Sequence, residues 1–201
     1  MKIIPYVLIE SRVPFQQGAL RRRIGEVVSG LSKKHDWVYV ADADGIFKNK
    51  PQLDMAQIIC DEMSTMYEGG VRYSHNVIDM LITGAEKAVV GTSTLVDLDE
   101  LRGAFKLSEN ITFKVDFRDG IVSSDPVMAG RALSDLFRDV ADIGIDEVLV
   151  PRTLAEEASS AVSRRGLKLG VIASPSELTS LEPLGIDYII SENQRSLVED
   201  E

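Results

Sequence analysis

The chain has 201 residues, of which 44% are hydrophobic and 27% are charged, and its formal net charge is −10. This length suits one domain with a sizeable core, so we predict a single domain over residues 1–201. The negative charge disfavours nucleic acid and anionic membranes as partners, and no apolar run approaches the roughly 20 residues that span a bilayer. Cys60 is the only cysteine, which excludes an intramolecular disulfide and favours a cytoplasmic location.

Apolar, β-rich runs alternate with amphipathic runs along nearly the whole chain. Strands are predicted at residues 3–9, 37–41, 63–67, 87–90, 112–115, 147–150, 168–173 and 188–190. Helices are predicted at residues 24–32, 53–62, 74–83, 97–106, 126–143, 153–165 and 176–184, with a last short helix at Leu197. Ser74 and Thr153 are predicted N-caps, and Pro126 suits a first helical turn after Asp125.

One short pattern recurs three times and indicates a repeated strand–helix unit. Gly84, Gly144 and Gly185 each lie at the end of a predicted helix, two or three residues before a strand. Eight strands that alternate with helices pair in parallel, and closing them removes both sheet edges. We therefore predict an α/β fold, a (β/α)8 TIM-type barrel, shortened relative to the ~250 residues of typical barrels. An open doubly wound sheet is the competing fold, but no Gly-x-Gly-x-x-Gly follows the first strand.

Small and acidic residues follow several of the predicted strands. Asp42 and Asp44 follow the second, Gly70 the third, Gly91 the fourth, and Asp116 ends the fifth. In a parallel barrel these strand ends meet at one rim, where ligands bind. One of the two acids after the second strand, Asp44 in our interpretation, contacts a ligand, and the other caps the turn at Gly45.

Glycine-containing turns after two adjacent strands predict an anion site. Glycine lets backbone N–H groups approach an anion, and each turn leads into a helix N-terminus. The predicted phosphate-binding residues are therefore Gly70, Val71, Arg72, Gly91 and Thr92. The alternative is that these glycines only serve the turns.

The same residues resemble the histidine-biosynthesis barrels, the family of the phosphoribosylformimino-aminoimidazole-carboxamide ribotide isomerase and of the cyclase subunit of imidazole glycerol phosphate synthase. The segment 68–72, Glu-Gly-Gly-Val-Arg, resembles the family's Gly-Gly-Gly-Ile-Arg turn, and 88–93 resembles its phosphate-binding Val-Ile-Gly-Thr. Residues 40–47 and the opening Ile3-Ile4-Pro5 also match family segments. Asp116 matches the aspartate that serves the family as general acid. The resemblance is clearest over residues 37–120 and implies a barrel that binds a phosphorylated metabolite.

The sequence departs from the family at several strand ends. Leu8 stands where the isomerase has an aspartate as general base. Pro151-Arg152 replaces the family's Thr-Asp after the sixth strand, and 174–176, Ser-Pro-Ser, replaces the Gly-Gly phosphate turn after the seventh. After the eighth strand, Ser191-Glu192 offers a carboxylate in place of glycine. The family's substrate bears two phosphates, whereas these residues suit one.

The predicted catalytic residues are Asp116 and Glu10, where Glu10 shares the strand parity of Leu8 and is a candidate substitute base. Asp44 and Arg152 are predicted as further ligand contacts, with Arg152 the one residue that could restore a second phosphate site. No cofactor or metal is predicted, and the sequence does not indicate the oligomeric state. We expect a singly phosphorylated ligand and sugar-phosphate isomerase or lyase chemistry. The alternative is a catalytically inactive barrel that acts as a ligand sensor or an assembly partner.

Overall fold

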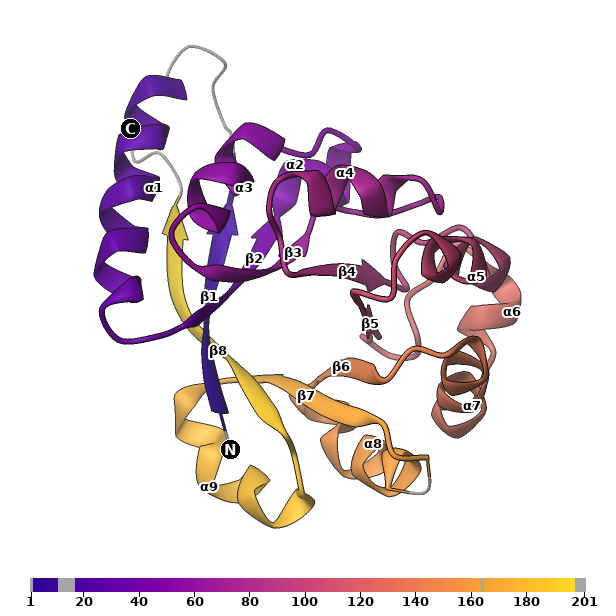
Figure 1. The fold of residues 1–201 in the computed structure, drawn as a ribbon. Helices are drawn as coiled ribbons and strands as arrows, with labels where there is room; N and C mark the ends of the chain where they lie inside the picture. Colours follow the sequence, from indigo (N-terminus) through magenta and orange to yellow (C-terminus); the bar gives the residue numbers. More distant parts are fainter. Residues whose placement is uncertain (1, 11–16, 164, 198–201) are drawn as a thin grey trace.

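The computed structural model describes residues 2–10, 17–163 and 165–197, and its strands close into one parallel barrel in the order β1 to β8, with β8 pairing with β1 (Figure 1). The closed eight-stranded barrel with its helices confirms the predicted fold class. The strands are β1(Lys2–Ile9), β2(Trp37–Asp42), β3(Ser64–Glu68), β4(Lys87–Gly91), β5(Ile111–Lys114), β6(Glu147–Pro151), β7(Lys168–Ala173) and β8(Tyr188–Leu197).

Helices follow the strands around the outside of the barrel. They are α1(Gln17–Ser32), α2(Ala43–Lys48), α3(Leu53–Cys60), α4(Asn76–Ile82), α5(Leu98–Leu107), α6(Pro126–Ala129), α7(Leu133–Ile143), α8(Ala155–Val162) and α9(Leu178–Leu181), with three-residue 3-10 turns η1(Arg152–Leu154), η2(Pro175–Glu177) and η3(Glu182–Leu184). No described helix is long and apolar enough to cross a membrane.

Several local predictions were wrong. The predicted helix over 126–143 is two helices, because Gly130 ends α6 before α7 begins. Leu197 lies in β8, not in a helix, because β8 continues its pairing with β1 up to Ile9. Neither Ser74 nor Thr153 is an N-cap. His75 precedes α4, and Thr153 lies inside η1.

Other local predictions are confirmed by the backbone. The Asp125 side chain accepts a hydrogen bond from the Val127 N–H at the start of α6, with Pro126 in the first turn. Gly84, Gly144 and Gly185 all have positive φ, 93°, 111° and 65°, at the ends of their helices. That conformation reverses the chain into the next strand, and it strains any residue that has a Cβ.

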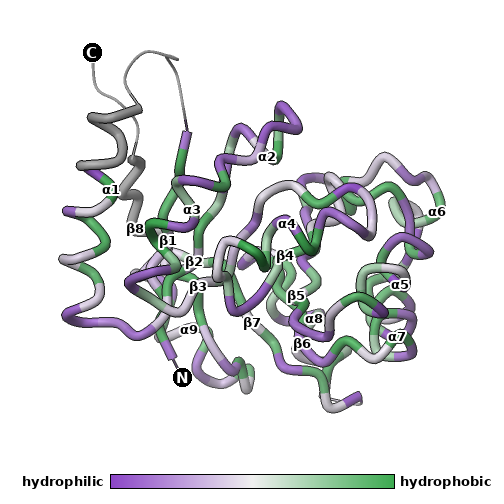
Figure 2. The backbone as a smooth tube through the Cα atoms, turned by 45° about the horizontal axis from the view of Figure 1, so that its top comes forward, coloured by the Kyte–Doolittle hydropathy of each residue, from purple (hydrophilic) through white to green (hydrophobic). Residues whose placement is uncertain are grey.

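Two separate hydrophobic clusters hold the barrel together. The larger lies between the strands and the helices, and side chains such as Val40, Tyr67 and Phe113 are fully buried in it. The smaller fills the inside of the barrel with Ile4, Tyr39, Met66, Val89, Leu149 and Ile190. Successive strand residues therefore point alternately outward and inward, and hydrophobic stretches follow the strands in Figure 2. Because both faces are buried, a charged strand residue needs a partner inside.

One such charged residue, with its hydrogen-bond partners, lies inside the amino-terminal end of the barrel. Glu147 begins β6 and is buried at the amino-terminal end of the barrel, where Lys87, Thr112 and Tyr188 donate to its carboxylate at 2.7, 2.7 and 2.8 Å. Burial and the Glu147 charge raise the pKa of the Tyr188 hydroxyl well above its usual value. Gly170 is required here, because a Cβ would lie 2.3 Å from the Tyr188 ring.

Candidate functional site at the carboxyl-terminal rim

The parallel barrel brings most of the predicted site residues to one rim. Asp44, Gly70, Gly91, Asp116 and Arg152 lie at or just beyond the carboxyl-terminal ends of β2, β3, β4, β5 and β6. Since every strand runs in the same direction, these ends face the same side of the barrel. The predicted placement on one rim is therefore confirmed, whereas the role of each residue stays a prediction.

Asp116 is held by three hydrogen bonds from its own chain. The Ser93 N–H and Ser93 hydroxyl donate to its Oδ2 at 3.1 and 2.7 Å, and Lys114 Nζ lies 2.7 Å from its Oδ1. Its backbone N–H donates to the Thr92 hydroxyl at 2.9 Å. Gly91 leaves the necessary space, because a Cβ there would lie 2.8 Å from Asp116 Oδ2. The turn after β4 thus binds the Asp116 carboxylate as it would bind a ligand anion.

Lys114 connects Asp116 to a second buried carboxylate inside the barrel. Its ammonium group donates to Glu68 Oε1 at 2.7 Å, and the Tyr39 hydroxyl donates to the other Glu68 oxygen. Burial by itself would lower the pKa of Lys114, but the Glu68 and Asp116 carboxylates outweigh it and raise that pKa. Lys114 is therefore charged at neutral pH and cannot act as an amine nucleophile.

Sequence reasoning missed Lys114, Glu68 and Ser93. A usable signal was present, because Lys114 shares the strand parity of Asp116 and lies in an otherwise apolar run. A lysine in a strand that is buried on both faces implies a buried carboxylate nearby. The sequence does not say which carboxylate that is, because Glu68 lies 46 positions away.

The turn after β3 contains glycine for structural reasons. Gly70 has a φ of +76°, and a Cβ on it would lie 2.3 Å from the Gly45 carbonyl oxygen, so the β2 and β3 turns pack directly on each other. Val71 is fully buried. Arg72 donates to the carbonyl oxygens of Gly45, Ile46 and Gly70 at 2.7 to 3.1 Å, so its side chain joins these two turns.

The free donors of this turn are backbone groups. Gly70 and Val71 are buried, and in the described part of the chain their N–H groups donate to no acceptor. The Arg72 and Tyr73 N–H groups are taken by the Asn76 side chain at 3.3 and 3.0 Å. Of the predicted phosphate-binding residues in this turn, Gly70 and Val71 therefore have N–H groups available, whereas Arg72 is engaged with the protein.

The acids after β1 and β2 have local partners. Asp42 caps α2 by accepting from the Gly45 N–H at 3.0 Å, as predicted for one member of the pair. Asp44 Oδ2 accepts from the Gln52 side chain at 2.9 Å, and its Oδ1 pairs with Lys48. Glu10 directly follows β1, and its charge, after that of Asp44, contributes to the raised pKa of Lys48. Leu8 packs against the inner cluster.

A cavity of about 340 Å³ opens at the rim between the ends of β5, β6 and β7. Lys114, Asp116, Arg152 and Glu177 supply its charged groups, with Phe117 and Ile172 among its apolar ones. The structure thus brings the predicted residues Asp116 and Arg152 into one cavity. No group of three or more potential metal ligands occurs among the described residues.

The turn after β7 has its donors occupied. Ser174 accepts from the Ser176 N–H, Glu177 accepts from the Ser174 N–H at 2.9 Å, and Pro175 has no N–H. This capping box leaves no pair of N–H groups for an anion. The side chain of Glu192, the carboxylate that stands in place of the family's glycine, lies outside the described part of the structure.

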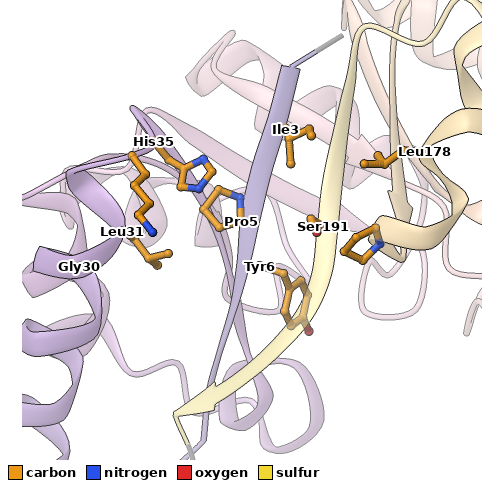
Figure 3. A pocket seen from close by; sticks show the side chains of 10 residues that line it. Ile3, Pro5, Tyr6, Gly30, Leu31, His35, Leu178 and Ser191 are labelled. Carbon is orange, nitrogen blue, oxygen red and sulfur yellow. The ribbon is translucent and has the colours of Figure 1, made fainter.

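A second cavity, of about 370 Å³, lies outside the barrel wall. Side chains from β1 and from α1 with the loop after it line one part, and residues of the η2–α9 region line another (Figure 3). Among the described residues no helix follows β8 to cover this place. None of the predicted site residues lines it.

Comparison with known proteins decides the family. The family model described as histidine biosynthesis protein matches residues 14–156, more than half of the chain. The chain belongs to this family. The match begins at residue 14, ahead of α1, and ends at the start of α8, and it includes the turns after β3 and β4 and the strand end at Asp116.

Several curated relatives that match this chain carry the name 1-(5-phosphoribosyl)-5-((5-phosphoribosylamino)methylideneamino) imidazole-4-carboxamide isomerase. The protein from Opitutus terrae is 30% identical over 168 residues, 74% of this chain and 68% of the relative. Those from Rhizorhabdus wittichii and Syntrophobacter fumaroxidans are 27% and 25% identical, over 77% of this chain and 71% and 69% of the relatives. At this identity, family membership does not by itself carry over the substrate.

Proposed function

We propose that this protein binds a small metabolite that carries one phosphate, with the phosphate at the turn after β3 and the rest of the ligand in the rim cavity beside Asp116. The observation that carries this proposal is the pair of buried N–H groups of Gly70 and Val71. Buried backbone N–H groups without an acceptor are rare in folded proteins, and a phosphate oxygen would satisfy them.

The number of phosphates follows from the contrast between two turns. The turn after β3 has N–H groups to offer, whereas the capping box after β7 uses its own. The relatives' name describes a substrate with two phosphoribosyl groups. A chain with one usable turn is suited to a smaller ligand, so we propose that the natural substrate differs from that of the named relatives.

The proposed chemistry is that of a sugar-phosphate isomerase or lyase, with Asp116 as the group that exchanges a proton with the substrate. Asp116 lines the rim cavity, and its position is set by Ser93, Thr92 and Lys114. Such positioning is what general acid–base catalysis requires. Glu10 remains the proposed second group. We propose a cytoplasmic location, in keeping with the single cysteine.

A second candidate function is a catalytically inactive barrel that senses a ligand or supports an assembly. Leu8 favours it, because a leucine at the proposed position of the base can neither give nor take a proton. The three hydrogen bonds on the Asp116 carboxylate also favour it, since a carboxylate that is fully engaged by its own chain is less available to a substrate.

Titration of the protein with inorganic phosphate, followed by calorimetry, tests the phosphate site. We expect one site per chain and tighter binding in Asp116→Asn, because the phosphate would lie near this carboxylate. Two like charges about 6 Å apart in water repel by roughly 0.7 kcal/mol, or about threefold in affinity. Asp146→Asn, at the opposite end of the barrel, is the control of equal charge and should leave binding unchanged. Two equal sites, or no binding, would contradict the proposal.

A further inference from the structure

Arg152 is a cation at the rim, and its only ion pair among the described residues is a long one, with Glu177. It begins η1 directly after β6, and its Nε atom is buried without an acceptor among the described residues. Its Nη2 reaches the Ser180 hydroxyl only at 3.4 Å, and Glu177 Oε1 lies 4.0 Å from Nε. The Nε of Arg131 also lacks an acceptor, but its Nη1 lies 2.9 Å from Asp139. Arg152 alone of these two is left without a close ion pair.

The other charges of the rim cavity are already committed. Lys114 is shared between Glu68 and Asp116, and Glu177 Oε2 accepts the Ser174 N–H. A buried donor without an acceptor is a free-energy cost that proteins rarely leave uncompensated. Because Arg152 lines a cavity large enough for several ligand atoms, a ligand acceptor is the natural source of compensation.

We propose that Arg152 binds a carboxylate of the ligand, so that the protein's ligands are phosphorylated sugar acids, with phosphate at one end and carboxylate at the other. This inference rests on the proposed function, because it assigns the end of the ligand that lies opposite the phosphate. A guanidinium group offers parallel N–H donors that match the two oxygens of a carboxylate.

A second phosphate fits this place less well than a carboxylate does. Phosphate sites are usually lined by several backbone N–H groups, and the nearest turn, after β7, uses its own in the capping box. Glu177, 4.0 Å from Arg152 Nε, also repels a dianion more strongly than a monoanion. One guanidinium beside one carboxylate is therefore suited to a singly charged group.

The spacing between strands sets the length of the ligand. The turn after β3, which supplies the proposed phosphate donors, and Arg152 after β6 are separated by three strand spacings, roughly 14 Å. A hydrogen bond of about 3 Å at each end leaves roughly 8 Å for the ligand between them. An extended six-carbon chain places a terminal phosphorus and a carboxylate carbon roughly 9 Å apart. Its middle carbons would then pass the end of β5, where Asp116 lies. A six-carbon phosphosugar acid is accordingly the first ligand to test.

Calorimetric titration with 6-phosphogluconate, glucitol 6-phosphate and gluconate tests the proposal. The first two differ only at carbon 1, carboxylate against hydroxymethyl, and gluconate lacks the phosphate. We expect the wild-type protein to bind 6-phosphogluconate about 10- to 100-fold more tightly than glucitol 6-phosphate, the range of a charged hydrogen-bonded contact. Arg152→Met should remove this preference, and Arg152→Lys, which keeps the charge but loses the parallel donors, should reduce it. Arg131→Met, with the same change in net charge, should leave it intact.

Each outcome separates this inference from the proposed function. Equal affinities of the wild-type protein for the two phosphate esters, or a preference that survives in Arg152→Met, would overturn the role of Arg152 while leaving the phosphate site in place. Gluconate binding as tightly as 6-phosphogluconate would overturn the phosphate site and keep the carboxylate site. If neither ester binds, both proposals fail. Thermal unfolding of each variant checks that it is folded, and Arg152→Lys provides the test if Arg152→Met is not.

Discussion

Replacing Lys114 by methionine is expected to destabilise the barrel strongly, because it leaves two carboxylates without their cation. The Glu68, Lys114 and Asp116 side chains are only 4%, 14% and 19% exposed, so water cannot take over the role of the ammonium group. Breaking a buried ion pair by removing one partner typically costs about 3–5 kcal/mol. For a chain of this size that corresponds to a fall in Tm of about 6–20 °C.

The control for Lys114→Met is Lys168→Met, which removes another lysine from a barrel strand. Lys168 pairs with Asp146 at 2.9 Å, but the two side chains are 55% and 60% exposed. Exposed pairs contribute about 0–1 kcal/mol, so Lys168→Met should shift the free energy of unfolding by no more than that. Urea unfolding followed by circular dichroism gives both values.

A double-mutant cycle tests the assigned cause of the loss. Glu68→Gln removes one of the two uncompensated charges and keeps an acceptor for the Tyr39 hydroxyl. The double variant Glu68→Gln, Lys114→Met should therefore lose about 0.5–3 kcal/mol less free energy of unfolding than the sum of the two single variants. If Lys114→Met costs no more than Lys168→Met, or if the cycle shows no coupling, the buried ion pairs do not hold the inner barrel and the reasoning is wrong.

Two further predictions concern catalysis and pH. Because Leu8 stands in place of a base, neither the natural chain nor Leu8→Asp should replace the histidine-pathway isomerase in a histidine-requiring strain. Growth with the natural chain would show that Glu10 or another group serves as base. Growth only with Leu8→Asp would show that a missing base is the sole defect. Three buried tyrosines have pKa values raised first by burial and then by a nearby carboxylate: Tyr39 by Glu68, Tyr67 by Asp42, and Tyr188 by Glu147. Above about pH 10 the unfolded chain therefore binds fewer protons than the folded one. Stability should then fall by up to about 4 kcal/mol per pH unit, with tyrosine ionisation at 295 nm coinciding with the loss of circular dichroism. Ionisation of these tyrosines in the folded protein would refute this.

The order of elements, and the rim on which the predicted site residues lie, follow from local patterns in the amino-acid sequence. Alternation of apolar strands with amphipathic helices, and glycines such as Gly84 and Gly144 at helix ends, are local patterns that depend on backbone geometry and burial alone. Parallel strands then place Asp44, Gly70, Gly91 and Asp116 on one side without any knowledge of packing. Local errors arose where short-range signals compete, as at Gly130, which interrupts a continuous apolar period, and at Leu197, where pairing with β1 decides the conformation.

The hydrogen-bond partners of these residues, in contrast, depend on how the strands pack together. Arg72 was predicted to bind phosphate, yet its guanidinium joins two turns, because the carbonyl oxygens of Gly45 and Ile46 come within reach only when β2 and β3 pair. Ser93 lies in a turn that was predicted to bind phosphate. Its N–H and hydroxyl groups instead donate to the Asp116 carboxylate, because β4 pairs with β5. Strand pairing brings residues from distant parts of the chain together, and the sequence shows which groups are charged but not which of them share a hydrogen bond. The Arg152 Nε–H lacks an acceptor for a similar reason, because the nearest carboxylate, Glu177, is held 4.0 Å away in its own capping box.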